Sequence, residues 1–122
     1  MIDAPQLEIL TVGRVGVDLY PEQQGPLAEV RTFAKFLGGT ATNVAVGAAR
    51  LGRRSAVLTK VGDDGFGAFV RMALAGFGVD PSYVGTSPDL HTPVVFCELN
   101  PPEDPPLLFY RDPVAPDLVR TP

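Results

Sequence analysis

Residues 38–52 read Gly38-Gly39-Thr40-Ala41-Thr42-Asn43-Val44-Ala45-Val46-Gly47-Ala48-Ala49-Arg50-Leu51-Gly52. The glycine pair lets a ligand approach the backbone, and the small residues after it predict a helix over about 42–51 that ends at Gly52. Asn43 adds a side-chain amide that both donates and accepts hydrogen bonds near the start of that helix. This stretch therefore predicts a small polar ligand held against a helix N-terminus.

Strands and helices alternate after this stretch and before it. We expect buried strands at 7–12 and 55–61, and a second helix after Asp63-Asp64-Gly65, whose aspartates are candidate N-caps. A further strand follows near residues 83–85. Strand, helix, strand, helix, strand describes two crossover units, which predicts an α/β fold with a parallel sheet flanked by helices.

Two extended segments, at about 17–37 and 93–111, fall outside this alternation. We expect their strands to form a small second sheet that protrudes from the main one as a lid. Open α/β proteins bind ligands beyond the carboxyl ends of their parallel strands. The ligand is therefore expected between that edge and the lid.

Composition excludes several classes of protein. The chain has 122 residues, 45% of them hydrophobic, which suits one packed domain. Its formal net charge is -4 with no basic stripe, and no apolar run reaches the roughly 20 residues of a membrane span, so we expect neither nucleic-acid nor membrane partners. Residues 1–5 lack the features of a signal peptide, and Cys97 is the single cysteine, so a cytoplasmic location is expected.

The run Gly38–Ala45, followed by Gly52 and Gly62, resembles the N-terminal signature of the ribokinase-like (PfkB-type) carbohydrate kinases, and residues 61–67 are also similar to that family. Within this family, the chain is most similar to kinases of sugar acids, and among them to those of inositol catabolism. The residues that carry this similarity are Val12-Gly13-Arg14, Asp18-Leu19-Tyr20 and Phe109-Tyr110-Arg111. The resemblance covers about 7–118. It implies a Rossmann-like fold and transfer of phosphate from ATP, with Mg²⁺, to a sugar hydroxyl.

The resemblance also implies which residues bind the substrate. Asp18 resembles the carboxylate that accepts hydrogen bonds from sugar hydroxyls, and Asn43 the amide that bonds another hydroxyl. In the Gly38-Gly39 pair, Gly39 resembles the glycine whose backbone faces the sugar. Each has a plainer interpretation: Asp18 as a turn residue, the glycine pair as tight helix–sheet packing, and Asn43 as a helix cap.

The end of the second lid segment carries the remaining substrate contacts. Arg111 resembles the arginine that meets the carboxylate of a sugar acid, although arginines at strand ends are usually solvated. Tyr110 or Phe109 supplies a wall or a hydroxyl contact beside it. Neighbours on a strand point to opposite faces, so the sequence leaves open which of the two faces inward.

The family's second motif, of the Gly-Ala-Gly-Asp kind, does not occur in the sequence. That motif carries the catalytic base, so no catalytic, cofactor-binding or metal-binding residue is predicted, and we expect ATP and Mg²⁺ to bind a longer parent enzyme rather than this chain. The whole chain, 1–122, is then a single N-terminal substrate-binding and lid portion, a fragment inactive alone.

Two other functions are considered. The chain could be a non-catalytic domain that associates with itself through its lid strands, because unpaired strand edges favour pairing. A dinucleotide-binding dehydrogenase is disfavoured, since Val12-Gly13-Arg14-Val15-Gly16 lacks a third glycine and does not open a helix.

Overall fold

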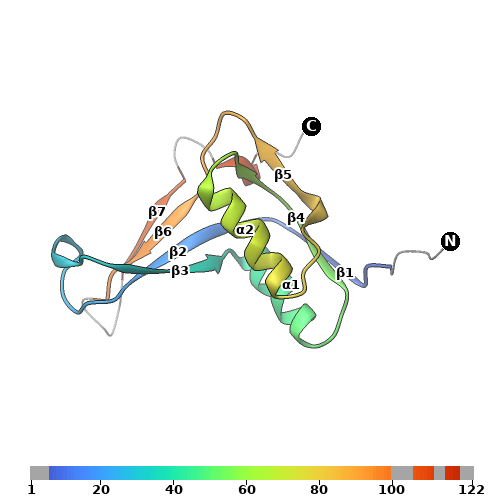
Figure 1. Ribbon diagram of the computed structural model, residues 1–122, viewed down its shortest axis with the longest axis horizontal. Coiled ribbons are helices and arrows are strands. Elements are labelled where there is room, and N and C mark those ends of the chain that lie inside the picture. The colour runs from blue at the N-terminus through green and yellow to red at the C-terminus, as the bar shows by residue number, and fades with distance from the viewer. Residues whose placement is uncertain (1–5, 100–105, 112–114, 119–122) are drawn as a thin grey trace.

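The computed structural model of the protein describes residues 6–99, 106–111 and 115–118. Its main sheet has three parallel strands in the order β1 (Ile9–Val12), β4 (Ser55–Gly62) and β5 (Val84–Ser87). Helices α1 (Thr40–Arg50) and α2 (Gly65–Gly76) lie together on one side of this sheet (Figure 1). The predicted α/β fold with a parallel sheet is therefore confirmed.

A second, four-stranded sheet projects away from the helices (Figure 1). Its order is β3 (Phe33–Gly38), β2 (Gly16–Pro21), β6 (Val94–Cys97) and β7 (Leu107–Tyr110). Strand β2 runs antiparallel to β3 and parallel to β6, and β7 runs antiparallel to β6. The two segments expected to form a lid thus supply all four strands; we call this sheet the lid sheet.

Both helices begin and end where local chemistry permits. Gly39 caps α1 with φ +106°, so this helix starts two residues earlier than predicted, and Gly52 follows its end with φ +84°. Asp64 caps α2 by accepting a hydrogen bond from the Gly67 N–H at 2.7 Å. Neither helix in the described ranges has the length and apolarity needed to cross a membrane.

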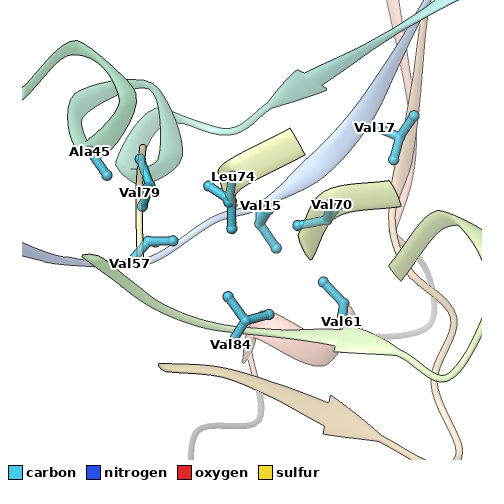
Figure 2. Packing of buried hydrophobic residues seen from close by; sticks show 9 residues of the cluster. All are labelled: Val15, Val17, Ala45, Val57, Val61, Val70, Leu74, Val79 and Val84. Carbon is cyan, nitrogen blue, oxygen red and sulfur yellow. The ribbon is translucent and has the colours of Figure 1, made fainter. Parts of the chain in front are cut away.

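The core lies between the two helices and β4 (Figure 2). Val57 and Val61 lie on the face of β4 that points toward the helices, where they belong to one cluster with Val70 and Leu74 of α2. Each of these four residues is at most 1% exposed. Burying each such side chain contributes about 1.5–3 kcal/mol of transfer free energy. Ala45 of α1 and Val15, which follows β1, belong to the same buried cluster, so the core also includes residues next to the site.

The other face of the main sheet is largely uncovered in the described part of the chain. Leu10 and Val12 of β1 and Leu58 of β4 are 47%, 49% and 43% exposed. Their register places them side by side, because Val12 pairs with Leu58. Large apolar side chains in a row on a sheet face are unusual for an isolated domain.

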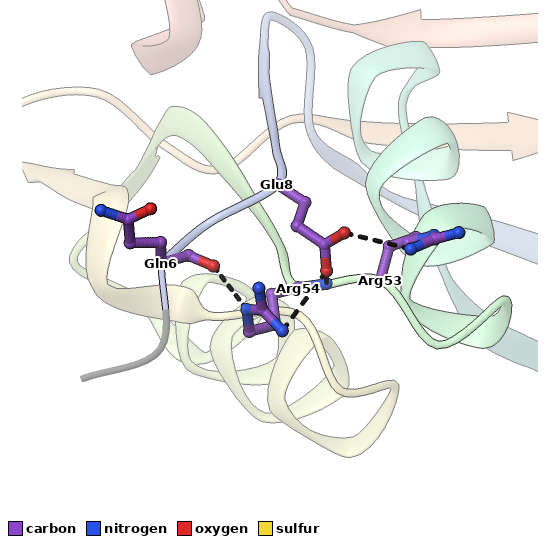
Figure 3. Close-up of polar contacts among 4 residues, drawn as sticks. All are labelled: Gln6, Glu8, Arg53 and Arg54. Atoms are coloured by element: carbon purple, nitrogen blue, oxygen red, sulfur yellow. Dashed lines mark hydrogen bonds and ion pairs between the residues drawn. The ribbon is translucent and has the colours of Figure 1, made fainter. Parts of the chain in front are cut away.

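A charge cluster joins the entry of β1 to the entry of β4 (Figure 3). Glu8 Oε2 lies 3.2 Å from Arg53 Nη1, and Glu8 Oε1 lies 3.5 Å from Arg54 Nη1 and accepts from the Arg54 backbone N–H at 3.3 Å. All three side chains are at least partly exposed, so solvent screens both pairs and they contribute little to stability. The cluster links the segments that enter two neighbouring parallel strands.

Candidate functional site

A cavity of about 230 Å³ lies beyond the carboxyl end of β1. Its floor is the turn at residues 14–16, one wall is the start of α1, and the other walls come from β2, β6 and β7 of the lid sheet. This is where an open parallel sheet is expected to hold a ligand. Enclosed sites for drug-sized ligands measure about 300–1,000 Å³, so this cavity suits a molecule the size of a hexose.

Strand register decides which lid residues face the cavity. Asp18 pairs with Val95 and Val95 pairs with Phe109, so these three share one face of the lid sheet, and all of them line the cavity. We call this the inner face. Leu19, Phe96 and Tyr110 alternate with them and share the opposite, outer face.

Asp18 lines the cavity from the inner face and is partly buried. Burial raises the pKa of its carboxyl above the ordinary value, because desolvation disfavours the charged form. Gly38 is buried beside it on β3, and a Cβ at Gly38 would lie 2.4 Å from Asp18 Oδ1. Gly38 thus makes room for the carboxylate and is not among the cavity-lining residues.

Gly39 brings the backbone at the start of α1 against the cavity floor. A Cβ at this position would lie 2.2 Å from the carbonyl oxygen of Arg14, and φ is +106°, so the close approach requires glycine. Asn43 lies one turn into α1, where its N–H bonds the Gly39 carbonyl at 2.8 Å. Gly39, not Asn43, is therefore the cap, and the exposed Asn43 side chain lines the cavity.

Arg111 also lines the cavity, at the end of β7, but its guanidinium is ion-paired. Nη2 donates to Oδ1 of Asp117, whose side chain is 1% exposed, and Asp117 Oδ2 accepts from the Val15 N–H at 3.2 Å. Asp117 thereby joins the end of the lid to the cavity floor. Sequence reasoning missed Asp117, because a single aspartate among prolines carries no pattern of its own.

The structure separates Tyr110 from the other predicted substrate residues. Tyr110 is 61% exposed on the outer face, with its ring centroid 5.5 Å from that of Phe96. Phe109 points the other way, into the cavity, where the guanidinium carbon of Arg14 lies 5.5 Å from its ring centroid. Phe109 therefore faces the cavity and Tyr110 faces away from it, and Arg14 also lines the cavity although the sequence analysis did not select it.

The residues present do not fit a nucleoside triphosphate with its metal. The cavity is of hexose size, and the described ranges contain no group of three or more His, Cys, Asp or Glu side chains placed to hold a metal ion. We therefore derive no step through ATP or Mg²⁺ from these residues.

A parallel sheet, a lid sheet and a polar cavity between them define a small-molecule-binding α/β protein with a lid. The family described as "pfkB family carbohydrate kinase" matches residues 6–119. The chain therefore belongs to the pfkB family of carbohydrate kinases, which confirms the resemblance read from the glycine-rich run.

Curated relatives point to one enzyme of that family. The chain is 39% identical over 111 residues to a protein named 5-dehydro-2-deoxygluconokinase from Clostridium tetani, covering 89% of this chain and 33% of the relative. It is 34% identical over 119 residues to a protein of the same name from Halalkalibacterium halodurans, covering 96% of this chain and 36% of the relative. The chain spans about a third of the length of the curated relatives it matches.

Solved structures share the fold. An uncharacterized sugar kinase from Pyrococcus horikoshii, in complex with ATP, superimposes with a TM-score of 0.81 at 38% identity over 88% of this chain and 35% of that one. A PfkB protein from Polaromonas sp. JS666 gives 0.83 at 32% identity, over 91% and 37%. A fructokinase from Halothermothrix orenii gives 0.76 at 25% identity, over 86% and 38%.

Proposed function

We propose that this chain is the sugar-binding and lid portion of an ATP-dependent carbohydrate kinase, and that its substrate is a sugar acid, 5-dehydro-2-deoxygluconate of inositol catabolism, in the cytoplasm. The observation that carries the proposal is the convergence of Asp18 and Arg111 on one hexose-sized cavity under the lid sheet. The names of the relatives support this acid, and 2-keto-3-deoxygluconate is the nearest alternative.

Each cavity residue has a chemical role in the proposal. Asp18 accepts hydrogen bonds from two sugar hydroxyls, and Asn43 bonds a third. The backbone at Gly39 lies close enough to the cavity for its helix N-terminus to face the sugar directly. Arg111 donates to the carboxylate, oriented by Asp117.

Phosphoryl transfer requires parts that this sequence does not contain. The Gly-Ala-Gly-Asp motif that supplies the base in the family is missing from residues 1–122. Positioning and charge stabilisation provide almost all of the catalysis in such reactions. We therefore expect this chain alone to bind the sugar acid without turning it over, and a parent enzyme to bring ATP and Mg²⁺.

Calorimetric titration of the chain with 5-dehydro-2-deoxygluconate and with D-fructose tests the proposal. We expect the acid to bind more tightly, and Arg111→Gln to weaken the acid about tenfold or more while changing fructose little. Tighter binding of fructose than of the acid would contradict the proposal and indicate that the substrate is a neutral sugar. If the purified chain and ATP phosphorylate the acid faster than a control without protein, the expected inactivity is contradicted.

A second candidate function, self-association through the lid, is favoured by the outer face of the lid sheet. Leu108 and Tyr110 are 39% and 61% exposed there, beside Phe96. Strands β3 and β7 are also edge strands of the lid sheet in the described part of the chain. We propose a homodimer that covers this face; a monomer in sedimentation at tens of micromolar would contradict it, and Tyr110→Asp is expected to dissociate it.

A further inference from the structure

The cavity is lined by a second arginine, Arg14, which is exposed and whose backbone is held by hydrogen bonds. Arg14 lies in the turn between β1 and β2, and its carbonyl accepts a hydrogen bond from Thr42 Oγ1 at 3.0 Å. The next residue, Val15, donates its N–H to Asp117 at 3.2 Å. The Arg14 guanidinium then lies over the Phe109 ring, 5.5 Å from the centroid, which holds it on the inner face of the lid sheet.

The two arginines of the cavity differ in how their charge is balanced. Arg111 is ion-paired with the buried carboxylate of Asp117, so its positive charge is largely compensated before any ligand binds. Arg14 forms no ion pair with any residue in the described ranges; its contacts there are the Phe109 ring and its own backbone bonds. Of the two cavity arginines, Arg14 is therefore the one without an ion-pair partner in the described part of the chain, and the Asp18 carboxylate faces the same cavity.

Both arginines line the same cavity. Phe109 lies in β7, Arg111 is the first residue after that strand, and both line the cavity. Arg14 stacks on the first of them and Arg111 is the second. A planar carboxylate between them would accept hydrogen bonds from both, whereas a hydroxymethyl group would gain little from a second cation.

We propose that Arg14 is a specificity-determining residue of this site: it supplies a guanidinium charge, not engaged in an ion pair within the described ranges, that selects a sugar carrying a carboxylate over a neutral sugar. The two arginines have different roles because of Asp117. Asp117 orients the Arg111 guanidinium as a hydrogen-bond donor, whereas Arg14 contributes its positive charge. This inference rests on the proposed function, because it assumes that the cavity binds a hydroxylated sugar acid.

The ligand pair for the test is 5-dehydro-2-deoxygluconate and the same molecule with its carboxylate reduced to a primary alcohol. The variants are Arg14→Gln, which removes the charge, and Arg14→Lys, which keeps it without the planar fork. Arg50→Gln is the matched control, because Arg50 also stacks on a phenylalanine, 5.0 Å from the Phe77 centroid, on the surface of α1 away from the cavity.

Calorimetry is expected to give a Kd for the acid about tenfold higher in Arg14→Gln, with the Kd for the alcohol within about twofold of wild type. Arg14→Lys should retain most of the preference for the acid, and Arg50→Gln all of it. Equal weakening of both ligands, or an unchanged preference in Arg14→Gln, overturns the inference. If Arg14→Gln does not fold, loss of the preference in a folded Arg14→Lys variant at low salt overturns it as well.

Different results would contradict the proposed function itself. It fails if folded wild-type chain binds neither molecule, or if Arg111→Gln leaves the affinity for the acid unchanged. An unchanged acid preference in Arg14→Gln, together with its loss in Arg111→Gln, would leave the proposed function standing and place the selecting charge on Arg111.

Discussion

The carboxylate of Asp18 occupies the space beside Gly38 that any other residue would fill with its Cβ. An added Cβ would lie 2.4 Å from Oδ1 and 2.6 Å from both Cγ and Oδ2, closer than atoms approach without displacement. Strand pairing fixes the two residues on neighbouring strands, since Gly38 pairs with Gly16 and Asp18 with Phe36. The position of the carboxylate thus depends on a residue that never contacts the cavity.

Gly38→Ala is expected to push the Asp18 carboxylate out of place. Overpacking of this kind costs about 1–3 kcal/mol of unfolding free energy, and the sugar loses its main acceptor, so its Kd should rise about tenfold. Chemical denaturation and calorimetry measure the two effects. Gly47→Ala is the control, because its added Cβ meets nothing within 4 Å on α1, and it should stabilise the chain by roughly 0.5–1 kcal/mol.

Asp18→Asn should separate stability from binding. Burial raises the pKa of Asp18 in the native state, so the native state holds the proton more tightly than the unfolded chain. Stability then falls as pH rises through the two pKa values, and a neutral amide avoids that loss. We expect Asp18→Asn to unfold at a higher temperature than wild type at pH 7, with the gap closing near pH 3.

The same variant should bind the sugar acid about tenfold or more weakly, because an amide is a poorer acceptor than a carboxylate. Thermal unfolding across pH and calorimetry at pH 7 check both halves. Asp89→Asn, an exposed aspartate outside the cavity, should change neither. A lower unfolding temperature for Asp18→Asn at pH 7 would show that the ionised carboxylate stabilises the fold.

Most of the fold was predictable because local signals agree with one another. Gly52 and Asp64 mark helix ends by backbone freedom and capping chemistry, and the short, largely apolar run at 55–61 marks a buried strand. The start of α1 was placed two residues late, because its cap is the backbone of Gly39 and has no side-chain signature. The order of segments then predicted the parallel sheet and the separate lid sheet.

The site was predictable only where one segment carries it. The family resemblance predicted Asp18 of β2 and Gly39 and Asn43 at the start of α1, and all three line the cavity. Alternation along a strand says that Phe109 and Arg111 share a face, but pairing with β6 is needed to say which face is inner. Asp117 connects the end of the lid to the cavity floor through a tertiary hydrogen bond from the Val15 N–H, and no local sequence pattern predicts that bond.

Asp64 should stabilise the start of α2 in a pH-dependent manner. Burial alone would raise its pKa, but hydrogen bonds from Thr92 N–H at 2.9 Å, from Thr92 Oγ1 at 2.7 Å and from Gly67 N–H at 2.7 Å outweigh it. The native pKa therefore lies below the ordinary 3.8, and the stabilisation is present above that value and lost as pH falls through the native pKa.

Asp64→Ala is expected to cost about 1–2 kcal/mol at pH 7, and the difference from wild type should shrink as pH falls below about 4. Urea unfolding at a series of pH values measures it. Asp63→Ala, the exposed neighbour that caps nothing, serves as the control. A cost that stays constant down to pH 2 would mean that the carboxylate charge plays no part.

The Arg111–Asp117 pair should respond unequally to loss of either partner. Asp117 is 1% exposed at its side chain, whereas Arg111 is 15% exposed and borders the cavity. Among the described residues, Arg111→Ala leaves the buried carboxylate with the Val15 N–H as its remaining donor, and breaking a buried pair in this way costs about 3–5 kcal/mol. Asp117→Ala leaves a guanidinium that cavity water can hydrate, so we expect only about 2 kcal/mol, mostly from the unpaired Val15 N–H.

Chemical denaturation of both single variants and of the double variant tests this order. The double variant should cost less than the sum of the two, because each single change already removes the shared interaction. Leu51→Ala, at an 83% exposed position after α1, provides a baseline near zero. If Asp117→Ala costs as much as Arg111→Ala, Arg111 is as poorly hydrated as Asp117, and the guanidinium is not free to turn toward a substrate carboxylate in the cavity.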